Sequence, residues 1–118
     1  MEASRINIGI TGELFFNPSE QKLFRGSRIH LLEKIEELGS INKAAKAVGL
    51  RYTTAWTTVK LINNMAEQPL VNRLVGGKGG GGTNLTPAGK KIVTKFRIIQ
   101  EEQQNFMIRL ENRFAEEV

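Results

Sequence analysis

Two helix-like stretches joined by a glycine restrict the possible folds of this chain more than any other feature. Helices that cross need a small residue at their contact, a turn residue that tolerates positive φ, and apolar residues that lock the angle. Ala45 provides the first and Gly49 the second. The apolar residues are Ala44, Val48, Leu50, Ala55 and Val59. The sequence therefore predicts a helix-turn-helix between Ile41 and Val59, although any corner between two helices needs a similar set.

The residues before this motif predict a β-hairpin and a further helix. Apolar and polar residues alternate over Ile6 to Ile10, and Asn17-Pro18 provides a turn further along. This pattern predicts an N-terminal β-hairpin over 5–24. Apolar positions at helical spacing follow, so we expect a three-helix core over 26–65 that includes the helix-turn-helix over 40–65.

The residues after the motif predict a second hairpin and a long helix. A run rich in Gly, from Gly76 to Gly82, separates two strand-like stretches and predicts a hairpin, or wing, over 70–86. Thr86-Pro87 is a strong helix start, and a helix over 87–115 is predicted from it. The length of 118 residues suits one domain, 1–118. This order predicts a mainly α fold with small β-hairpins, namely a winged helix-turn-helix with a long C-terminal dimerisation helix.

Positive charge is concentrated in the middle of the sequence. The net charge is +5, yet the acidic residues of 40–97 are limited to Glu67, while 1–39 and 98–118 are slightly acidic. The basic residues of the middle are Lys43, Lys46, Arg51, Lys60, Arg73, Lys78, Lys90, Lys91, Lys95 and Arg97. Such segregation is typical of a chain that binds a polyanion, nucleic acid first. The alternative is a solvated basic face that has no partner.

Composition argues against several classes of function. The absence of Cys and the single His leave no thiolate or zinc cluster and no Ser–His–Asp centre, so we expect no metal, no cofactor and no enzyme activity. No apolar run approaches the roughly 18 residues of a membrane span, and the N-terminus lacks a signal-peptide pattern. We therefore expect a cytoplasmic protein without a membrane partner. His30, Glu33, Glu36 and Glu37 are interpreted as solvent-exposed residues of the first helix.

A helical projection of the third helix indicates which side chains are available to DNA. Thr53, Thr57 and Lys60 lie opposite its apolar face, where Thr and Lys can reach base edges or phosphates. The other candidate DNA contacts are Lys43, Lys46, Arg51, Tyr52, Arg73, Lys78 and Lys90. The alternative for the threonines is simple exposure to water. Trp56, at the flank of the apolar face, is interpreted as a half-buried packing residue.

The glycine-rich stretch has three interpretations. A Gly-x-Gly-x-x-Gly pattern arises trivially in such a run and lacks the βαβ context of a dinucleotide fold. The phosphate-loop pattern fails because Gly77-Lys78 is not followed by Ser or Thr. We favour a wing tip that brings Lys78 near a phosphate backbone, and the alternative is a linker without a contact role.

The predicted long helix carries a seam of apolar residues at spacings of three and four, which is typical of helix pairing. The candidate dimerisation residues are Ile92, Phe96, Ile99, Phe106 and Leu110. A helix of about 44 Å is too long to bury this stripe against a three-helix core. A homodimer is therefore expected.

The sequence also resembles a known family. Gly39 to Trp56 (GSINKAAKAVGLRYTTAW) is similar to the helix-turn-helix of ModE-type molybdate-responsive regulators. Val75 to Gly82, followed by Leu85-Thr86 and Gly89, resembles the glycine-rich wing and next helix start of that family. The resemblance covers about 5–115, and the architecture implies a more distant likeness to LysR-type DNA-binding domains.

The resemblance implies a dimeric winged helix that binds palindromic promoter DNA, with the long helix and the N-terminal region in the dimer interface. The sequence departs from the family at Arg51, where relatives usually have Ser, and this changes the entrance of the recognition helix. Full-length members continue into oxyanion-binding domains beyond the point where this sequence ends. We therefore expect no molybdate site in this chain.

The main hypothesis is a sequence-specific transcription regulator that binds double-stranded DNA. One alternative is a winged-helix protein-interaction module that uses the long apolar helix. Another is an architectural DNA binder with little sequence preference. Replacing Thr53, Thr57 and Lys60 by Glu separates the first hypothesis from the protein-interaction module, because only a DNA reader would be impaired.

Overall fold

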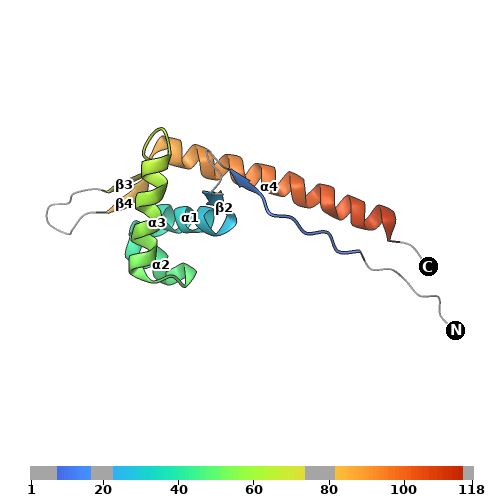
Figure 1. Ribbon diagram of the computed structural model, residues 1–118, viewed down its shortest axis with the longest axis horizontal. Coiled ribbons are helices and arrows are strands. Elements are labelled where there is room, and N and C mark those ends of the chain that lie inside the picture. The colour runs from blue at the N-terminus through green and yellow to red at the C-terminus, as the bar shows by residue number, and fades with distance from the viewer. Residues whose placement is uncertain (1–7, 17–22, 74–81, 116–118) are drawn as a thin grey trace.

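The computed structural model describes residues 8–16, 23–73 and 82–115, and it has a mostly helical architecture with two small antiparallel hairpins (Figure 1). This is the predicted fold class. The elements are β1 (Phe15–Phe16), β2 (Phe24–Arg25), α1 (Gly26–Leu38), α2 (Ile41–Val48), α3 (Tyr52–Met65), β3 (Val71–Arg73), β4 (Thr83–Leu85) and α4 (Pro87–Phe114). The predicted wing tip, including Lys78, lies outside the described residues.

Two regions of different character make up the molecule, whose extents are 72 × 28 × 21 Å. We call α1–α3, the β1–β2 hairpin strands, the β3–β4 stem and α4 up to Phe96 the head. We call residues 97–114 of α4, with the extended residues 8–14 beside them, the stalk (Figure 1). The described core lies in the head, where Ile29, Leu32 and Ile35 of α1 are fully buried.

Both ends of α2 are capped by the residues that the sequence offers. The Ser40 hydroxyl accepts a hydrogen bond from the Lys43 N–H at 3.2 Å. At the other end Gly49 has a backbone φ of +75°, which residues with a Cβ rarely adopt. The N–H groups of Gly49 and Leu50 donate to the carbonyls of Lys46 and Ala45 at 3.3 and 2.8 Å, which completes a Schellman cap. This cap sets the angle between α2 and α3.

The N-terminal hairpin is shorter than predicted. Phe15–Phe16 pairs antiparallel with Phe24–Arg25, but the described residues before Phe15 are extended and form no strand, so the strand prediction is wrong for Ile8 and Ile10. These residues run beside α4 (Figure 1), where the Ile10 N–H donates to a Glu111 carboxylate oxygen at 2.9 Å. The alternation of apolar and polar residues wrongly predicted a strand here. The neighbouring element is the helix α4, whose backbone is already hydrogen-bonded and therefore cannot pair with this segment as a second strand would.

The carboxylates of α1 are only partly the solvated face that we expected. Glu33 accepts a hydrogen bond at 2.9 Å from Nε of Arg97 on α4. Glu36 accepts one at 2.7 Å from the backbone N–H of Leu85 on β4. Both residues therefore join α1 to other elements, which helical periodicity cannot reveal. Glu37 pairs with Lys34 within the helix, and His30 is exposed as predicted.

Candidate nucleic-acid interface

The helix that follows the Gly49 turn presents one polar face to solvent. Ala55, Val59 and Ile62 of α3 are buried in the head. Thr53, Thr57 and Lys60, on the opposite side of the helix, are exposed as the projection predicted. Their arrangement leaves methyl, hydroxyl and ammonium groups accessible to a ligand, and these groups can contact base edges and phosphates.

The Thr57 hydroxyl is oriented by its own helix. It donates a hydrogen bond to the backbone carbonyl of Thr53 at 2.9 Å. The oxygen lone pairs and the methyl group of Thr57 are therefore the parts left to interact with another molecule. A methyl-bearing side chain in this position is suited to contact the methyl group of thymine.

Further candidate contacts lie on α2 and at the start of α3. Lys43, Lys46 and Arg51 are exposed, and Tyr52 is 47% exposed. Lys43, Lys46 and Tyr52 line a shallow hollow of about 350 Å³ together with Leu50. The structure thus brings the predicted cations of α2 next to the first turn of α3, on the accessible side of the helix-turn-helix.

Both strands of the wing stem are hydrogen-bonded to the helical part of the head. The N–H of Thr83 on β4 donates to the Gly39 carbonyl, in the turn between α1 and α2, at 2.9 Å. On the other strand, the Asn63 amide oxygen accepts from the N–H groups of Leu70 and Val71 at 2.9 and 3.1 Å, and its NH₂ donates to the Val71 carbonyl at 3.1 Å. Sequence reasoning missed Asn63; the available signal was an Asn beside the apolar face, close to a chain reversal.

Arg73 at the end of β3 lies against α3. Its guanidinium carbon is 4.0 Å from the ring centroid of Trp56. Tyr52 meets the same indole edge-on, with the ring centroids 5.7 Å apart and the rings at 79°. Trp56 is half-buried and packs on the core, as predicted, but its outer face also carries a cation.

Two cations of the basic middle have carboxylate partners within the chain. Arg97 bonds to Glu33, and its guanidinium holds the pKa of that carboxyl below its ordinary value. Nζ of Lys90 lies 3.6 Å from Glu36, although its side chain is 59% exposed. The candidate phosphate contact Lys90 is therefore partly neutralised, because Glu36 approaches from α1.

The candidate dimerisation residues of α4 are divided between the head and the stalk. Phe96 is fully buried and packs edge-on against Phe16 with ring centroids 5.3 Å apart, so its prediction as an interface residue is wrong. Ile92 also packs against the core. Ile99 and Phe106 are 38% and 53% exposed. Leu110 is half-buried. The seam was misassigned at its start because the N-terminal hairpin already covers that part of the helix.

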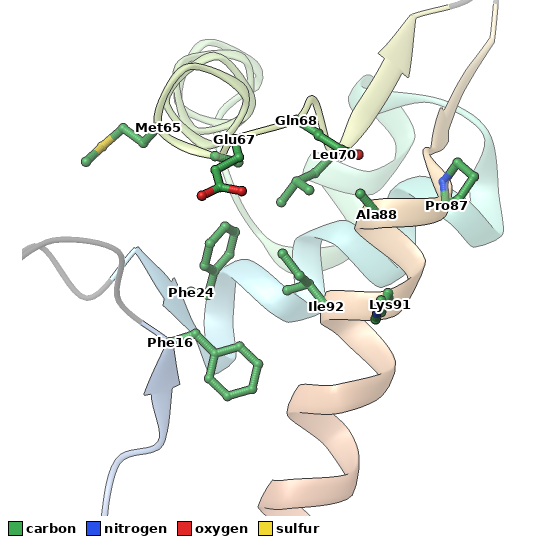
Figure 2. Close-up of a pocket in the computed structure, with 11 residues that line it drawn as sticks. Phe16, Phe24, Met65, Glu67, Gln68, Leu70, Pro87, Ala88, Lys91 and Ile92 are labelled. Atoms are coloured by element: carbon green, nitrogen blue, oxygen red, sulfur yellow. The ribbon is translucent and has the colours of Figure 1, made fainter.

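A hollow of about 720 Å³ opens at the C-terminal end of α3 (Figure 2). Phe16, Phe24 and Ile92 form apolar walls, and the Glu67 carboxylate lies at the edge of the hollow next to Phe24 (Figure 2). The hollow is lined by β1, β2, the end of α3 and the first turns of α4, and none of the candidate DNA contacts lines it. The two ends of α3 therefore have different surroundings, one polar and basic and the other largely apolar.

The helix-turn-helix packs its apolar side on the core and exposes the polar face of its second helix, and a β-hairpin stem flanks it. This arrangement defines a winged-helix protein of the kind that binds nucleic acid. Residues 27–90 match the family described as bacterial regulatory helix-turn-helix protein, lysR family. The chain belongs to this family of DNA-binding transcription regulators. The matched family model describes a regulatory helix-turn-helix and not a catalytic domain. No helix in the described ranges is long and apolar enough to cross a membrane.

Named relatives agree with this assignment. The chain is 49% identical over 90 residues to the molybdenum transport protein ModE of Azotobacter vinelandii, covering 76% of this chain and 33% of that protein. It is 41% identical over 86 residues to the DNA-binding transcriptional dual regulator ModE of Escherichia coli K12, covering 72% of this chain and 33% of that protein. The chain thus spans about a third of the length of these relatives, which supports the predicted resemblance to the DNA-binding part of ModE.

Solved structures share the fold. A G34K mutant of MepR from S. aureus aligns with a TM-score of 0.60 at 21% identity, covering 72% of this chain and 64% of that one. The MepR–DNA complex from S. aureus aligns with a TM-score of 0.55 at 22% identity, covering 74% of this chain and 73% of that one. At this level of identity the likeness concerns the winged-helix fold.

Proposed function

We propose that the chain binds palindromic promoter DNA as a homodimer in the cytoplasm, with α3 in the major groove and the wing near the backbone. The observation that carries this proposal is the exposed row Thr53, Thr57 and Lys60 on the helix that follows the Schellman-capped turn. Recognition helices place their N-terminal residues deepest in the groove, which favours Thr53 and Thr57 as base readers.

The cations around this row would neutralise phosphates. The proposed phosphate contacts are Lys43, Lys46, Arg51, Arg73, Lys78 and Lys90. Phosphate contacts release counterions, so the logarithm of the binding constant is expected to fall steeply with the logarithm of salt concentration. Among them Lys90 is expected to contribute least, because Glu36 competes for its ammonium group.

The stalk supports the homodimer. Ile99 and Phe106 leave apolar surface exposed, which is unfavourable unless another chain covers it. The start of α4 is basic through Lys90, Lys91 and Lys95, whereas the described acidic residues of its second half are Glu101, Glu102 and Glu111. This charge distribution favours an arrangement in which the first turns of α4 lie near DNA and the rest of the helix projects away from it. Two recognition helices would then be expected to read half-sites about 34 Å apart.

Selection from a randomised duplex library at near-physiological salt tests the proposal. The expected result is a two-fold-symmetric site with half-sites about one DNA turn apart. Retention of duplexes without an enriched sequence would contradict sequence-specific reading, and no retention would contradict DNA binding altogether. Molybdenum, which the name of the Azotobacter vinelandii relative mentions, has no part in this proposal because the chain matches only a third of that protein.

Lys60→Ala in α3, compared with Lys34→Ala in α1, links this result to the interface. Both changes remove one exposed or partly exposed ammonium group, but Lys34 lies on α1 and is paired with Glu37. We expect Lys60→Ala to weaken binding of the selected site and Lys34→Ala to leave it unchanged. Equal losses in the two variants would mean that only the net charge matters.

A further inference from the structure

The stacked pair of Arg73 and Trp56 calls for an explanation that core packing does not supply. Nε1 of Trp56 is buried and has no hydrogen-bond partner among the described atoms. A phenylalanine or leucine would fill an apolar site without burying an unsatisfied N–H group. What an indole adds is a strongly attractive face for a cation, and the Arg73 guanidinium lies over that face at 4.0 Å.

The backbone at Arg73 is already fixed. Arg73 pairs with Thr83 in the stem, and the Thr83 N–H is bonded to Gly39. Asn63 holds the first residues of the same strand. Only the long side chain of Arg73 remains to be oriented, and the indole provides the surface that orients it.

The stacked guanidinium keeps its binding capacity. A guanidinium that lies flat on an aromatic ring still has its N–H donors in its own plane, pointing outward in a fork that fits a phosphate. Arg73 is exposed, and among the described residues no carboxylate pairs with it. The stack therefore reduces the motion of the side chain without occupying its donors.

We propose that Trp56 is a positioning residue for DNA binding, which acts by holding the Arg73 guanidinium ready for a backbone phosphate where the wing meets the recognition helix. This inference rests on the proposed function, because it names how one of the phosphate contacts of that function is prepared. Trp56 itself touches no base. The edge-on contact with Tyr52 keeps the indole plane in place.

A double-mutant cycle on DNA affinity tests the inference. The variants are Trp56→Leu, Arg73→Gln and the two combined, with Lys34→Gln as the charge control, and binding of a dye-labelled duplex carrying the selected site is followed by anisotropy over a series of salt concentrations. Arg73→Gln is expected to lower the salt slope by about 1.8 for the dimer, because each of the two subunits loses one phosphate contact at about 0.9 per contact. Trp56→Leu is expected to weaken binding about two- to fivefold per subunit while largely keeping the salt slope of the wild type.

In the combined variant we expect no further loss beyond that of Arg73→Gln, because Trp56 acts through Arg73. Arg73→Lys, which keeps the charge but lacks the planar fork, is expected to bind with intermediate affinity. Trp56→Phe retains an aromatic face and serves as the milder variant, and thermal unfolding checks that each variant is folded.

Two results would overturn the inference while leaving the proposed function intact. One is that the losses of Trp56→Leu and Arg73→Gln multiply, which would make Trp56 a packing residue independent of Arg73. The other is that Arg73→Gln leaves the salt slope unchanged. Failure of the wild-type chain to bind any duplex would instead overturn the proposed function.

Discussion

The head and the stalk use the same kinds of apolar side chain in opposite ways. Along α4 the last buried hydrophobic residue of the described chain is Phe96, and most of the large apolar residues that follow are exposed, while Met107 and Leu110 are half-buried. The exposed large hydrophobic residues of the described stalk are Ile98, Ile99, Phe106, Ile108 and Phe114. The head buries most of its large apolar side chains within one chain, whereas the stalk does not. An apolar pattern thus shows that a surface will be covered, and the fold decides whether the same chain covers it.

The largest effect should come from removing equal side chains in the two regions. Ile35 is fully buried and Ile108 is 52% exposed. We expect Ile35→Ala to lower the free energy of unfolding by about 2 to 5 kcal/mol, and Ile108→Ala to lower it by less than about 0.5 kcal/mol at concentrations where the chain is monomeric. Urea unfolding at several protein concentrations measures both. If Ile108→Ala cost as much as Ile35→Ala at every concentration, the distinction between head and stalk would fail.

A smaller effect concerns the packing of the first turn of α4 inside the head. Gly89, in the first turn of α4, lies so close to the Leu70 backbone that an added Cβ would collide with the Leu70 carbonyl. Gly89→Ala is expected to cost about 1 to 3 kcal/mol, as overpacking does. Gly26→Ala is the control, because nothing lies within 4 Å of a Cβ at that position. Thermal unfolding measures the stability of both variants. Equal stability of the two would refute the close packing of Gly89 against the Leu70 backbone.

Neighbouring asparagines on α3 test the attachment of the wing. Asn63 makes three hydrogen bonds to Leu70 and Val71, and Asn64 is exposed. Asn63→Ala is expected to lower the free energy of unfolding by about 1 kcal/mol and Asn64→Ala to leave it unchanged. Hydrogen exchange at the Val71 amide should increase in the first variant alone. Unchanged protection of that amide would argue against this attachment.

The smallest effect is a dependence on pH. Because hydrogen bonding to Arg97 lowers the pKa of Glu33 below 4.5 in the folded chain, the ionised carboxylate stabilises the fold above about pH 4.5. That contribution is lost as the pH falls through the lowered pKa. It is expected to be at most about 1 kcal/mol, since both side chains are partly exposed. Melting temperatures of the wild type and Glu33→Gln should therefore converge as the pH falls from 6 to below 4. Parallel curves would exclude this contribution.

Local signals in the sequence predicted the head well. The Ser40 cap, the Gly49 turn and the Thr86-Pro87 helix start each depend on a residue and its immediate neighbours, so α2, α3 and α4 begin or end where such residues stand. The exposed row on α3 followed from helical periodicity alone. These features need no knowledge of distant parts of the chain.

Contacts between distant segments were beyond the sequence pattern. Neither the bond between Glu33 and Arg97 nor that between Asn63 and β3 has a periodic signature. Phe96 belongs to a regular apolar seam, yet Phe16 covers it from 80 positions earlier in the chain. The candidate DNA contacts remain predictions, because their partner is a separate molecule.

The contact between Trp56 and Arg73 has a spectroscopic consequence. Trp56 is the only tryptophan of the sequence, so the ultraviolet emission of the protein originates at the seam between the recognition helix and the wing. Indole emission responds to nearby charge and to the polarity of its surroundings. A phosphate that bound the Arg73 guanidinium would therefore change the wavelength of maximum emission or the intensity of the indole fluorescence. The protein carries its own optical reporter of wing engagement, with no attached dye required.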